Sequence, residues 1–249
     1  MTEKLTINTV HEGDCLELMK RIPDGSVDMI LCDLPYGTTA AKWDTIIPFE
    51  PLWEQYERVI KDNGAIVLTA SQPFTTALIS SNMSIYRYNL VWEKEQGTDF
   101  FMAKKKPLKN FEDICVFYKA QPTYNPQMVD VGKSWEKRDT GKTFNHIVGH
   151  QEKPHDKKSQ GTTRYPLSIL KFDRPKQKGV HPTQKPVALF EYLIRTYTNE
   201  GELVLDNCIG SGTTAVAAIN TGRKFIGIEQ EPKYVDIARK RIADAYSAK

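Results

Sequence analysis

The segment Asp33-Leu34-Pro35-Tyr36 combines residue types that could hold a flat ring bearing an amine. It follows the apolar run 27–32, which is typical of a buried parallel strand, so the segment lies where a strand meets a loop. Ligands usually bind at such places in open α/β sheets. The Asp33 carboxylate and a backbone carbonyl can accept hydrogen bonds from an exocyclic amine, while Tyr36 can stack on the ring. Alone, so short a motif is more typical of a polar turn after a strand.

A second group of residues near the end of the sequence is suited to binding a cofactor. Residues 204–214 combine a strand, a Gly-rich turn and the start of a helix, and Gly210 and Gly212 allow the backbone to approach a ligand. Glu229 ends the next strand, 23 residues after Asp206, where an acid can hold the hydroxyls of a ribose. The spacing fits a dinucleotide or S-adenosylmethionine. Only about one βαβ unit follows Asp206, which argues against the dinucleotide.

Alternating apolar runs and helical spacings predict an α/β fold that positions both groups. Strands are expected at 10–15, 27–32, 65–70, 86–92, 114–118, 202–206 and 224–229. Helices are expected at 16–21, 49–61, 73–81, 187–197, 213–221 and 232–245. Residues 120–180 have few long apolar runs and are predicted to form an inserted lobe or long loops outside the core.

Charge is unevenly distributed along the sequence. The formal net charge is +3, but residues 99–180 contain 17 Lys and Arg against 9 Asp and Glu. This excess favours a polyanionic partner for the middle of the chain, although a solvated basic surface would have the same composition. The four cysteines form no Cys-x-x-Cys pair, so neither a disulfide framework nor a metal site is expected. Without a signal peptide or membrane span, the predicted location is the cytoplasm.

In motif content and order, the sequence resembles the β group of amino-methylating (N6-adenine or N4-cytosine) DNA methyltransferases. Four segments carry the resemblance: Gly13-Asp14-Cys15, Asp33-Leu34-Pro35-Tyr36, His181-Pro182-Thr183-Gln184-Lys185-Pro186, and Asp206 to Thr214. The resemblance implies a Rossmann-like, S-adenosylmethionine-dependent methyltransferase sheet with circularly permuted motif order. Residues 1–119 would form the catalytic half, 120–180 a target-recognition insertion, and 181–249 the cofactor-binding half.

The resemblance also implies roles for individual residues. Catalysis would fall to Asp33, Leu34, Pro35 and Tyr36. Independently of the resemblance, the basic cluster offers candidate contacts to DNA phosphates near the catalytic face, although a solvated loop would have the same composition: Lys104, Lys105, Lys106 and Lys109. The S-adenosylmethionine pocket would be lined by Asp14, Cys15, Asp33, Thr183, Lys185, Asp206, Cys208, Gly210, Ser211, Gly212, Thr213 and Glu229. Three positions depart from the family pattern, with Leu34 in place of the first proline and Asn207 and Cys208 in place of Pro and Phe.

The expected reaction is methyl transfer to the N6 amine of an adenine flipped out of double-stranded DNA. In this family an acid at the first motif position usually accompanies adenine, whereas serine accompanies N4 of cytosine, so Asp33 favours adenine. The resemblance further suggests a homodimer and a cognate restriction endonuclease as partners. The alternatives are an N4-cytosine methyltransferase, a nicotinamide-dependent oxidoreductase and a non-catalytic DNA-binding relative.

Overall fold

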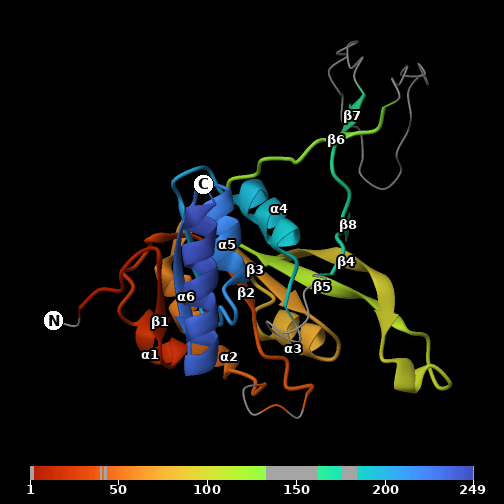
Figure 1. Ribbon diagram of the computed structural model, residues 1–249, viewed down its shortest axis with the longest axis horizontal. Coiled ribbons are helices and arrows are strands. Elements are labelled where there is room, and N and C mark those ends of the chain that lie inside the picture. The colour runs from red at the N-terminus through yellow and green to blue at the C-terminus, as the bar shows by residue number, and fades with distance from the viewer. Residues whose placement is uncertain (1–2, 40, 42–43, 133–161, 175–183, 249) are drawn as a thin grey trace. The chain divides into compact units, whose positions relative to one another are not determined.

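The computed structural model describes residues 3–39, 41, 44–132, 162–174 and 184–248 (Figure 1). The chain divides into a larger unit, Met1–Asn125 with Leu167–Lys249, and a smaller unit, Pro126–Pro166. In the described part of the smaller unit, strands β6 (Val129–Asp130) and β7 (Thr163–Arg164) pair in antiparallel orientation. The candidate site lies in the larger unit.

In the described residues of the larger unit, eight strands form one sheet in the order β1-β10-β9-β2-β3-β5-β4-β8. The strands are β1 (Thr9–Glu12), β2 (Val27–Asp33), β3 (Ile60–Ala70), β4 (Tyr86–Thr98), β5 (Lys109–Phe117), β8 (Ile169–Lys171), β9 (Leu203–Asp206) and β10 (Lys224–Glu229). Neighbouring strands are parallel except where β5 pairs with β3 and β4. The carboxyl ends of β1, β10, β9, β2 and β3 therefore meet at one edge.

Helices cover both faces of this sheet (Figure 1). One face packs against α1 (Cys15–Met19), α2 (Phe49–Val59) and α3 (Phe74–Ser81), and the other against α4 (Val187–Tyr197), α5 (Thr213–Asn220) and α6 (Pro232–Ser247). Side chains that alternate along β2 contribute to the hydrophobic cores on both faces of the sheet. Ile30 and Cys32 belong to the core under α1, α2 and α3, while Met29 and Leu31 belong to the core under α4, α5 and α6. This two-sided burial explains why β2 is a continuous apolar run.

The chain leaves β2 and β9 toward opposite faces, although these two strands are neighbours. After β2 it reaches α2 on the first face, whereas after β9 it reaches α5 on the second. Such a divergence opens a crevice beyond the carboxyl ends of the strands, where α/β folds bind ligands. The two groups of residues singled out from the sequence end these two strands.

The structure corrects two boundaries expected from the sequence. The second helix ends at Val59 and β3 begins at Ile60, so Asn63 and Gly64 lie inside a strand and do not terminate the helix. Ile60 pairs with Val27, which extends the sheet backward along β3. Strands β4 and β5 are also longer than expected, because their polar ends pair with each other as a two-stranded ribbon.

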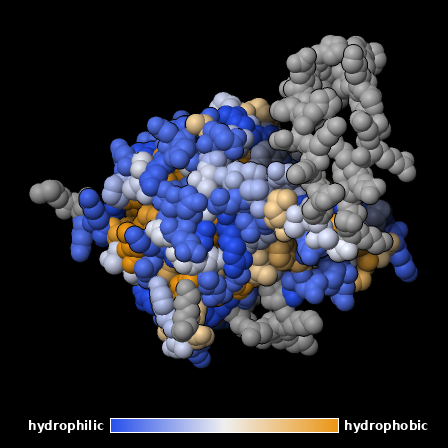
Figure 2. Space-filling model, turned by 90° about the horizontal axis from the view of Figure 1, so that it is seen from above, coloured by the Kyte–Doolittle hydropathy of each residue, from blue (hydrophilic) through white to orange (hydrophobic). Residues whose placement is uncertain are grey.

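Residues 169–171, which the sequence analysis placed with the insertion, form β8 at the sheet edge and pair with β4. The proposed division at 119/120 and 180/181 remains a prediction. The face shown in Figure 2 is mostly hydrophilic, with hydrophobic residues in small patches. In the described part of the chain, no helix is both long and apolar enough to cross a membrane.

Candidate active site

A cavity of about 540 Å³ occupies the crevice at the carboxyl ends of β2, β9 and β10. Cavities of this size hold small molecules and cofactors. It brings together most of the residues expected to bind cofactor or act in catalysis. These are Asp14, Cys15, Asp33, Leu34, Pro35, Tyr36, Lys185, Asp206, Cys208, Gly210, Ser211, Thr213 and Glu229.

Other predicted residues lie elsewhere. Gly212 does not line the cavity, because its α-carbon faces helix α6, where an added Cβ would lie 3.0 Å from that of Ala238. Lys104, Lys105 and Lys106 are exposed in the turn between β4 and β5. Lys109 donates a hydrogen bond to Ser71, which does line the cavity. Thr183 lies outside the described residues.

The Asp33 carboxylate is held by three donors from three parts of the chain. The hydroxyls of Tyr36, at 2.8 Å, and Thr69 donate to Oδ1, and the ammonium group of Lys185 donates to Oδ2 at 2.6 Å. Because a carboxylate has about four acceptor positions, roughly one remains for a ligand. The side chain is 25% exposed, so a ligand in the cavity can reach it.

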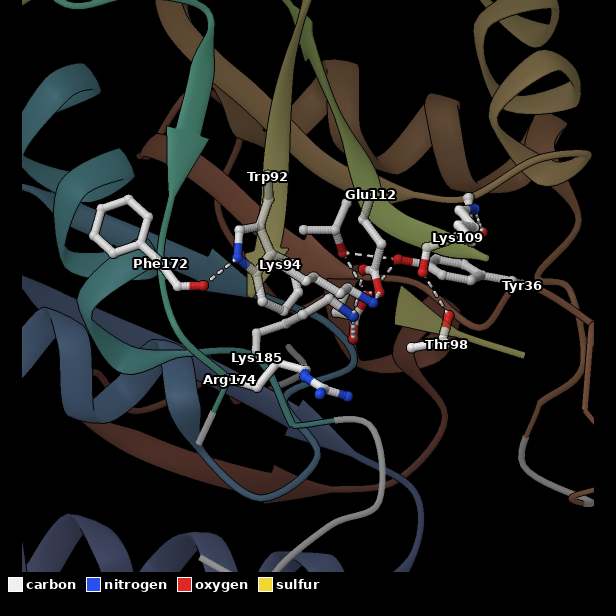
Figure 3. Close-up of polar contacts among 12 residues, drawn as sticks. Tyr36, Trp92, Lys94, Thr98, Lys109, Glu112, Phe172, Arg174 and Lys185 are labelled. Carbon is white, nitrogen blue, oxygen red and sulfur yellow. Dashed lines mark hydrogen bonds and ion pairs between the residues drawn. The ribbon is translucent and has the colours of Figure 1, made fainter. Parts of the chain in front are cut away.

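Lys185 continues into a buried row of alternating charges (Figure 3). Its ammonium group lies 3.2 Å from Oε2 of Glu112, and Lys94 lies 2.5 Å from Oε1 of the same carboxylate. Burial alone would lower the pKa of Lys185, whose side chain is 5% exposed, but Asp33 and Glu112 outweigh burial and raise it. For Glu112, burial raises the pKa, and the two lysines lower it by more. Lys185 and Glu112 therefore both favour their charged forms.

The loop after β2 is anchored in the protein. The Leu34 side chain is 4% exposed and belongs to the first hydrophobic core, so its packing restrains the position where the family has proline. The Tyr36 ring stacks on Phe74, with ring centroids 5.1 Å apart. Burial, followed by the charges of Asp33 and Glu112, raises the pKa of Tyr36 well above its usual value. Its hydroxyl therefore remains a donor.

Asp44 fixes the next part of this loop. Its carboxylate accepts hydrogen bonds from the backbone amides of Gly37 (2.8 Å), Thr38 (2.9 Å) and Thr39 (2.6 Å). Gly37 has a φ of 66°, in the left-handed region that favours glycine. Asp44, Thr38 and Thr39 all line the cavity, so this cap determines the shape of one wall.

On the opposite wall, Glu229 organises the Gly-rich turn. Its carboxylate accepts hydrogen bonds from the amides of Gly210 and Glu231, each at 2.9 Å. Burial raises the pKa of Glu229 above its usual value, although these amides favour the charged form. Two of about four acceptor positions remain for a ligand such as a diol.

Asp206 ends β9 beneath the same turn. Its oxygens accept hydrogen bonds from the Cys208 amide, at 3.0 Å, and from the Thr214 hydroxyl. Burial raises the pKa of Asp206 to about 7, and these hydrogen bonds reduce the shift without cancelling it. Asp206 therefore titrates much closer to neutral pH than an exposed aspartate does.

Comparison with solved structures places the fold among the Rossmann-like methyltransferases, as the sequence predicted. The chain resembles the M1.HpyAVI–SAM complex with 26% identity and a TM-score of 0.62, covering 94% of this chain and 98% of that one. It shares the fold of the cytosine-N4-specific PvuII DNA methyltransferase with 16% identity and a TM-score of 0.68, covering 98% and 93% of the respective chains.

The family follows from the sequence match. The chain belongs to the N6/N4 DNA methylase family, whose model matches residues 27–240. It is 27% identical to the Type II methyltransferase M1.MboII of Moraxella bovis, covering 94% of this chain and 96% of that protein. It is 29% identical to M.HinfI of Haemophilus influenzae, covering 96% and 69%. Family membership makes the protein a DNA methyltransferase and decides against the nicotinamide-dependent alternative.

Proposed function

We propose that this DNA methyltransferase transfers a methyl group from S-adenosylmethionine to the N6 amine of adenine. The observation that carries the proposal is the Asp33 carboxylate, anchored by three donors with about one acceptor position left toward the cavity. An acid at this motif position favours adenine over cytosine in the family that the chain resembles. The base itself stays a proposal.

The catalytic loop would act on the amine through hydrogen bonds. Asp33 and the Leu34 carbonyl accept its two N–H groups, which draws the nitrogen out of conjugation with the ring and frees its lone pair. Attack of this lone pair on the methyl carbon would form the new carbon–nitrogen bond as the carbon–sulfur bond breaks, and sulfur would keep the electron pair. The nitrogen later loses a proton to solvent or to Asp33. Positioning contributes much of the rate in such a transfer.

Lys185 and Glu112 would adjust the charge around this loop. As the bond forms, the amine nitrogen becomes positive, and an isolated lysine close to Asp33 would oppose that change. Glu112, 3.2 Å from Lys185, offsets its charge, while Lys185 still holds the Asp33 carboxylate in place. The sequence analysis assigned Lys185 to the cofactor pocket; its contacts support an additional role in positioning Asp33.

The residues opposite Asp33 fit S-adenosylmethionine, which supplies a methyl group on a positively charged sulfur. Glu229 has acceptor positions for the ribose hydroxyls, and Asp206 provides negative charge beneath the turn. Gly210 has a φ of 51° and no heavy atom closer than 4.0 Å to the position of an added Cβ, so the turn leaves space for a ligand. M1.HpyAVI, one of the related structures, is a SAM complex.

Nucleoside mass spectrometry of DNA from cells that express the protein tests the base. We expect N6-methyladenine, with none in DNA from cells expressing Asp33→Ala. N4-methylcytosine as the only product would overturn the adenine assignment while leaving the site intact. Absence of any methylated base with folded wild-type protein would contradict the proposed activity.

Cofactor affinity should depend on pH through Asp206. Its pKa is about 7 because of burial, and a positively charged ligand favours the carboxylate form. Affinity should therefore rise with pH and level off above 7, with a loss of about tenfold between pH 8 and pH 6. Calorimetry across this range measures the profile, and Asp206→Asn should flatten it. If the affinity of the wild-type protein did not change with pH, Asp206 would not contribute its charge to cofactor binding.

The basic turn between β4 and β5 should contribute to DNA affinity. Changing Lys104, Lys105 and Lys106 together to Ala should weaken binding because fewer phosphate counterions are released. The slope of log K against log salt should decrease by up to about 2.7, at about 0.9 for each phosphate contact. Binding isotherms at several salt concentrations measure it. An unchanged slope would show that this cluster does not face DNA.

Several relatives are named Type II methyltransferases. On that ground we also propose a cognate restriction endonuclease that recognises the same site. A homodimer remains a prediction from the family resemblance, as does a cytoplasmic location. Sedimentation of the purified protein across a concentration series would decide the oligomeric state.

A further inference from the structure

Two adjacent phenylalanines are exposed in the turn between β4 and β5. The Phe100 side chain is 66% exposed and that of Phe101 is 86% exposed. Together they form the first part of a short 3-10 helix, η1 (Phe100–Met102). A phenylalanine gains about 2–3 kcal/mol when it is fully buried, so an adjacent exposed pair indicates a binding surface.

The turn presents the two rings from a defined backbone. The amide of Met102 donates to the Asp99 carbonyl at 2.8 Å, and that of Ala103 donates to the Phe100 carbonyl at 3.1 Å. The backbone amides of Lys105 and Lys106 both donate to the Met102 carbonyl, at 2.8 and 3.0 Å. These hydrogen bonds hold the chain in a compact turn, and the rings project from it.

The same turn adjoins the candidate active site. Asp99, immediately before Phe100, lines the cavity. At the base of the turn, the Thr98 hydroxyl donates to the Lys109 carbonyl at 3.0 Å, and Lys109 in turn bonds Ser71 on the cavity wall (Figure 3). The phenylalanines therefore directly follow a residue of the cavity wall in the chain.

The charges beside the rings identify the partner. Lys104, Lys105 and Lys106 follow the phenylalanines after Met102 and Ala103, and an ion pair of 3.2 Å joins Lys106 to Asp99. Apolar rings beside a row of lysines are complementary to nucleic acid, where phosphates surround stacked bases. Because the chain belongs to a DNA methylase family, DNA is the partner that supplies both phosphates for the lysines and stacked bases for the rings.

We propose that Phe101, supported by Phe100, inserts into the DNA base stack next to the target base and fills the space that this base leaves. The inference rests on the proposed function, because it requires a base to leave the duplex. A gap in the stack costs several kcal/mol, and an aromatic ring that stacks in it recovers part of that cost. Phe101 thus favours the flipped-out state without touching the reacting atoms.

The test compares wild-type protein with variants at Phe101 on a duplex that contains the fluorescent base 2-aminopurine at the methylated position. Sequencing of modified DNA first locates that position. With wild-type protein, the fluorescence of the probe should rise as the base leaves the stack. Phe101→Ala should lose most of this rise and reduce kcat/KM on duplex DNA by about tenfold or more. Phe101→Trp should retain both, since it keeps an aromatic surface.

Two further measurements separate insertion from general damage. On a duplex whose target base is already unpaired, Phe101→Ala should regain most of its activity, because unpairing no longer has to be driven by the protein. Its KM for S-adenosylmethionine should be unchanged. Tyr246→Ala removes an exposed aromatic side chain from α6, far along the chain from this turn, and should behave like wild type in every assay.

Wild-type fluorescence and wild-type duplex activity in Phe101→Ala, and also in the double variant with Phe100→Ala, would overturn the inference. Equal losses on paired and unpaired targets would also overturn it, since they would point to a role unrelated to unstacking. Failure of the proposed function looks different: wild-type protein itself would then methylate neither DNA.

Discussion

Replacing Asp33 by alanine is expected to reduce methyl transfer by about 10³-fold or more while S-adenosylmethionine affinity weakens only slightly. The carboxylate is the acceptor that would polarise the target amine, and electrostatic contacts of this kind are worth orders of magnitude in rate. The substitution also leaves the Tyr36 and Thr69 hydroxyls without their shared acceptor. Single-turnover transfer of a labelled methyl group measures the rate, and calorimetry measures cofactor affinity.

Asp28→Ala is a matched control from the same strand. Asp28 lies at the other end of β2 and does not line the cavity. It pairs with Lys61 at 2.5 Å and accepts a hydrogen bond from the Leu203 amide at 2.9 Å, so its removal also takes away an ion pair and an acceptor. We expect a lower melting temperature with transfer close to wild type. Near-normal transfer by Asp33→Ala would remove Asp33 from the mechanism, whichever base is the substrate.

The second large effect is expected for Gly212→Val, which should abolish measurable S-adenosylmethionine binding. Gly212 has a φ of 87°, where a β-branched residue is strained, and an added Cβ would lie 3.1 Å from the Ala238 α-carbon. The turn must therefore move away from α6, and the amides of the Gly-rich turn lose their positions. Calorimetry on the folded variant measures the loss. The effect would be indirect, because Gly212 supports the cavity wall from behind.

Gly222→Val offers the comparison. Gly222 has a φ of 75°, but the nearest atom to its added Cβ is a Glu200 side-chain carbon at 3.8 Å. Valine at position 222 is therefore strained to a similar degree as valine at position 212, but it does not collide with a packed helix. We expect reduced stability with cofactor binding retained. If folded Gly212→Val bound S-adenosylmethionine as tightly as wild type, the turn would not form the cofactor site.

The sequence predicted the bounds of helices and strands best where buried apolar residues recur at regular intervals or where a strand is buried on both faces. Helix α4 (Val187–Tyr197) and strand β10 (Lys224–Glu229) have the predicted bounds, because each buries apolar residues in a regular pattern. The ends of β4 and β5 carry no such pattern. The polar residues of these ends pair with each other in a two-stranded ribbon. The length of this ribbon depends on the register between β4 and β5, and no pattern within either strand indicates it.

The same distinction applies to the candidate site. Motifs identified Asp33, the Gly-rich turn and Lys185, since these are continuous in sequence. Glu112 was missed because it lies in a polar stretch, and only the pairing of β4 with β5 brings it beside Lys94 and Lys185. Asp44 was missed for a related reason: its function as a cap depends on a loop conformation. An acid that follows a glycine turn by a few residues was the only available signal.

The adjacency of β2 and β9 has a consequence for synthesis of the protein. Met29 pairs with Val204 and Ile30 with Leu205, so one side of β2 is completed by residues far later in the chain. At about 5–20 residues per second, roughly 10–30 s pass on the ribosome between the two strands. During that interval the apolar edge of β2 has no β9 to pair with, and it is open to association with other chains. A nascent chain that has not reached Leu203 carries Asp33 but lacks the strand that positions the cofactor wall, so by the proposed mechanism it cannot yet transfer a methyl group.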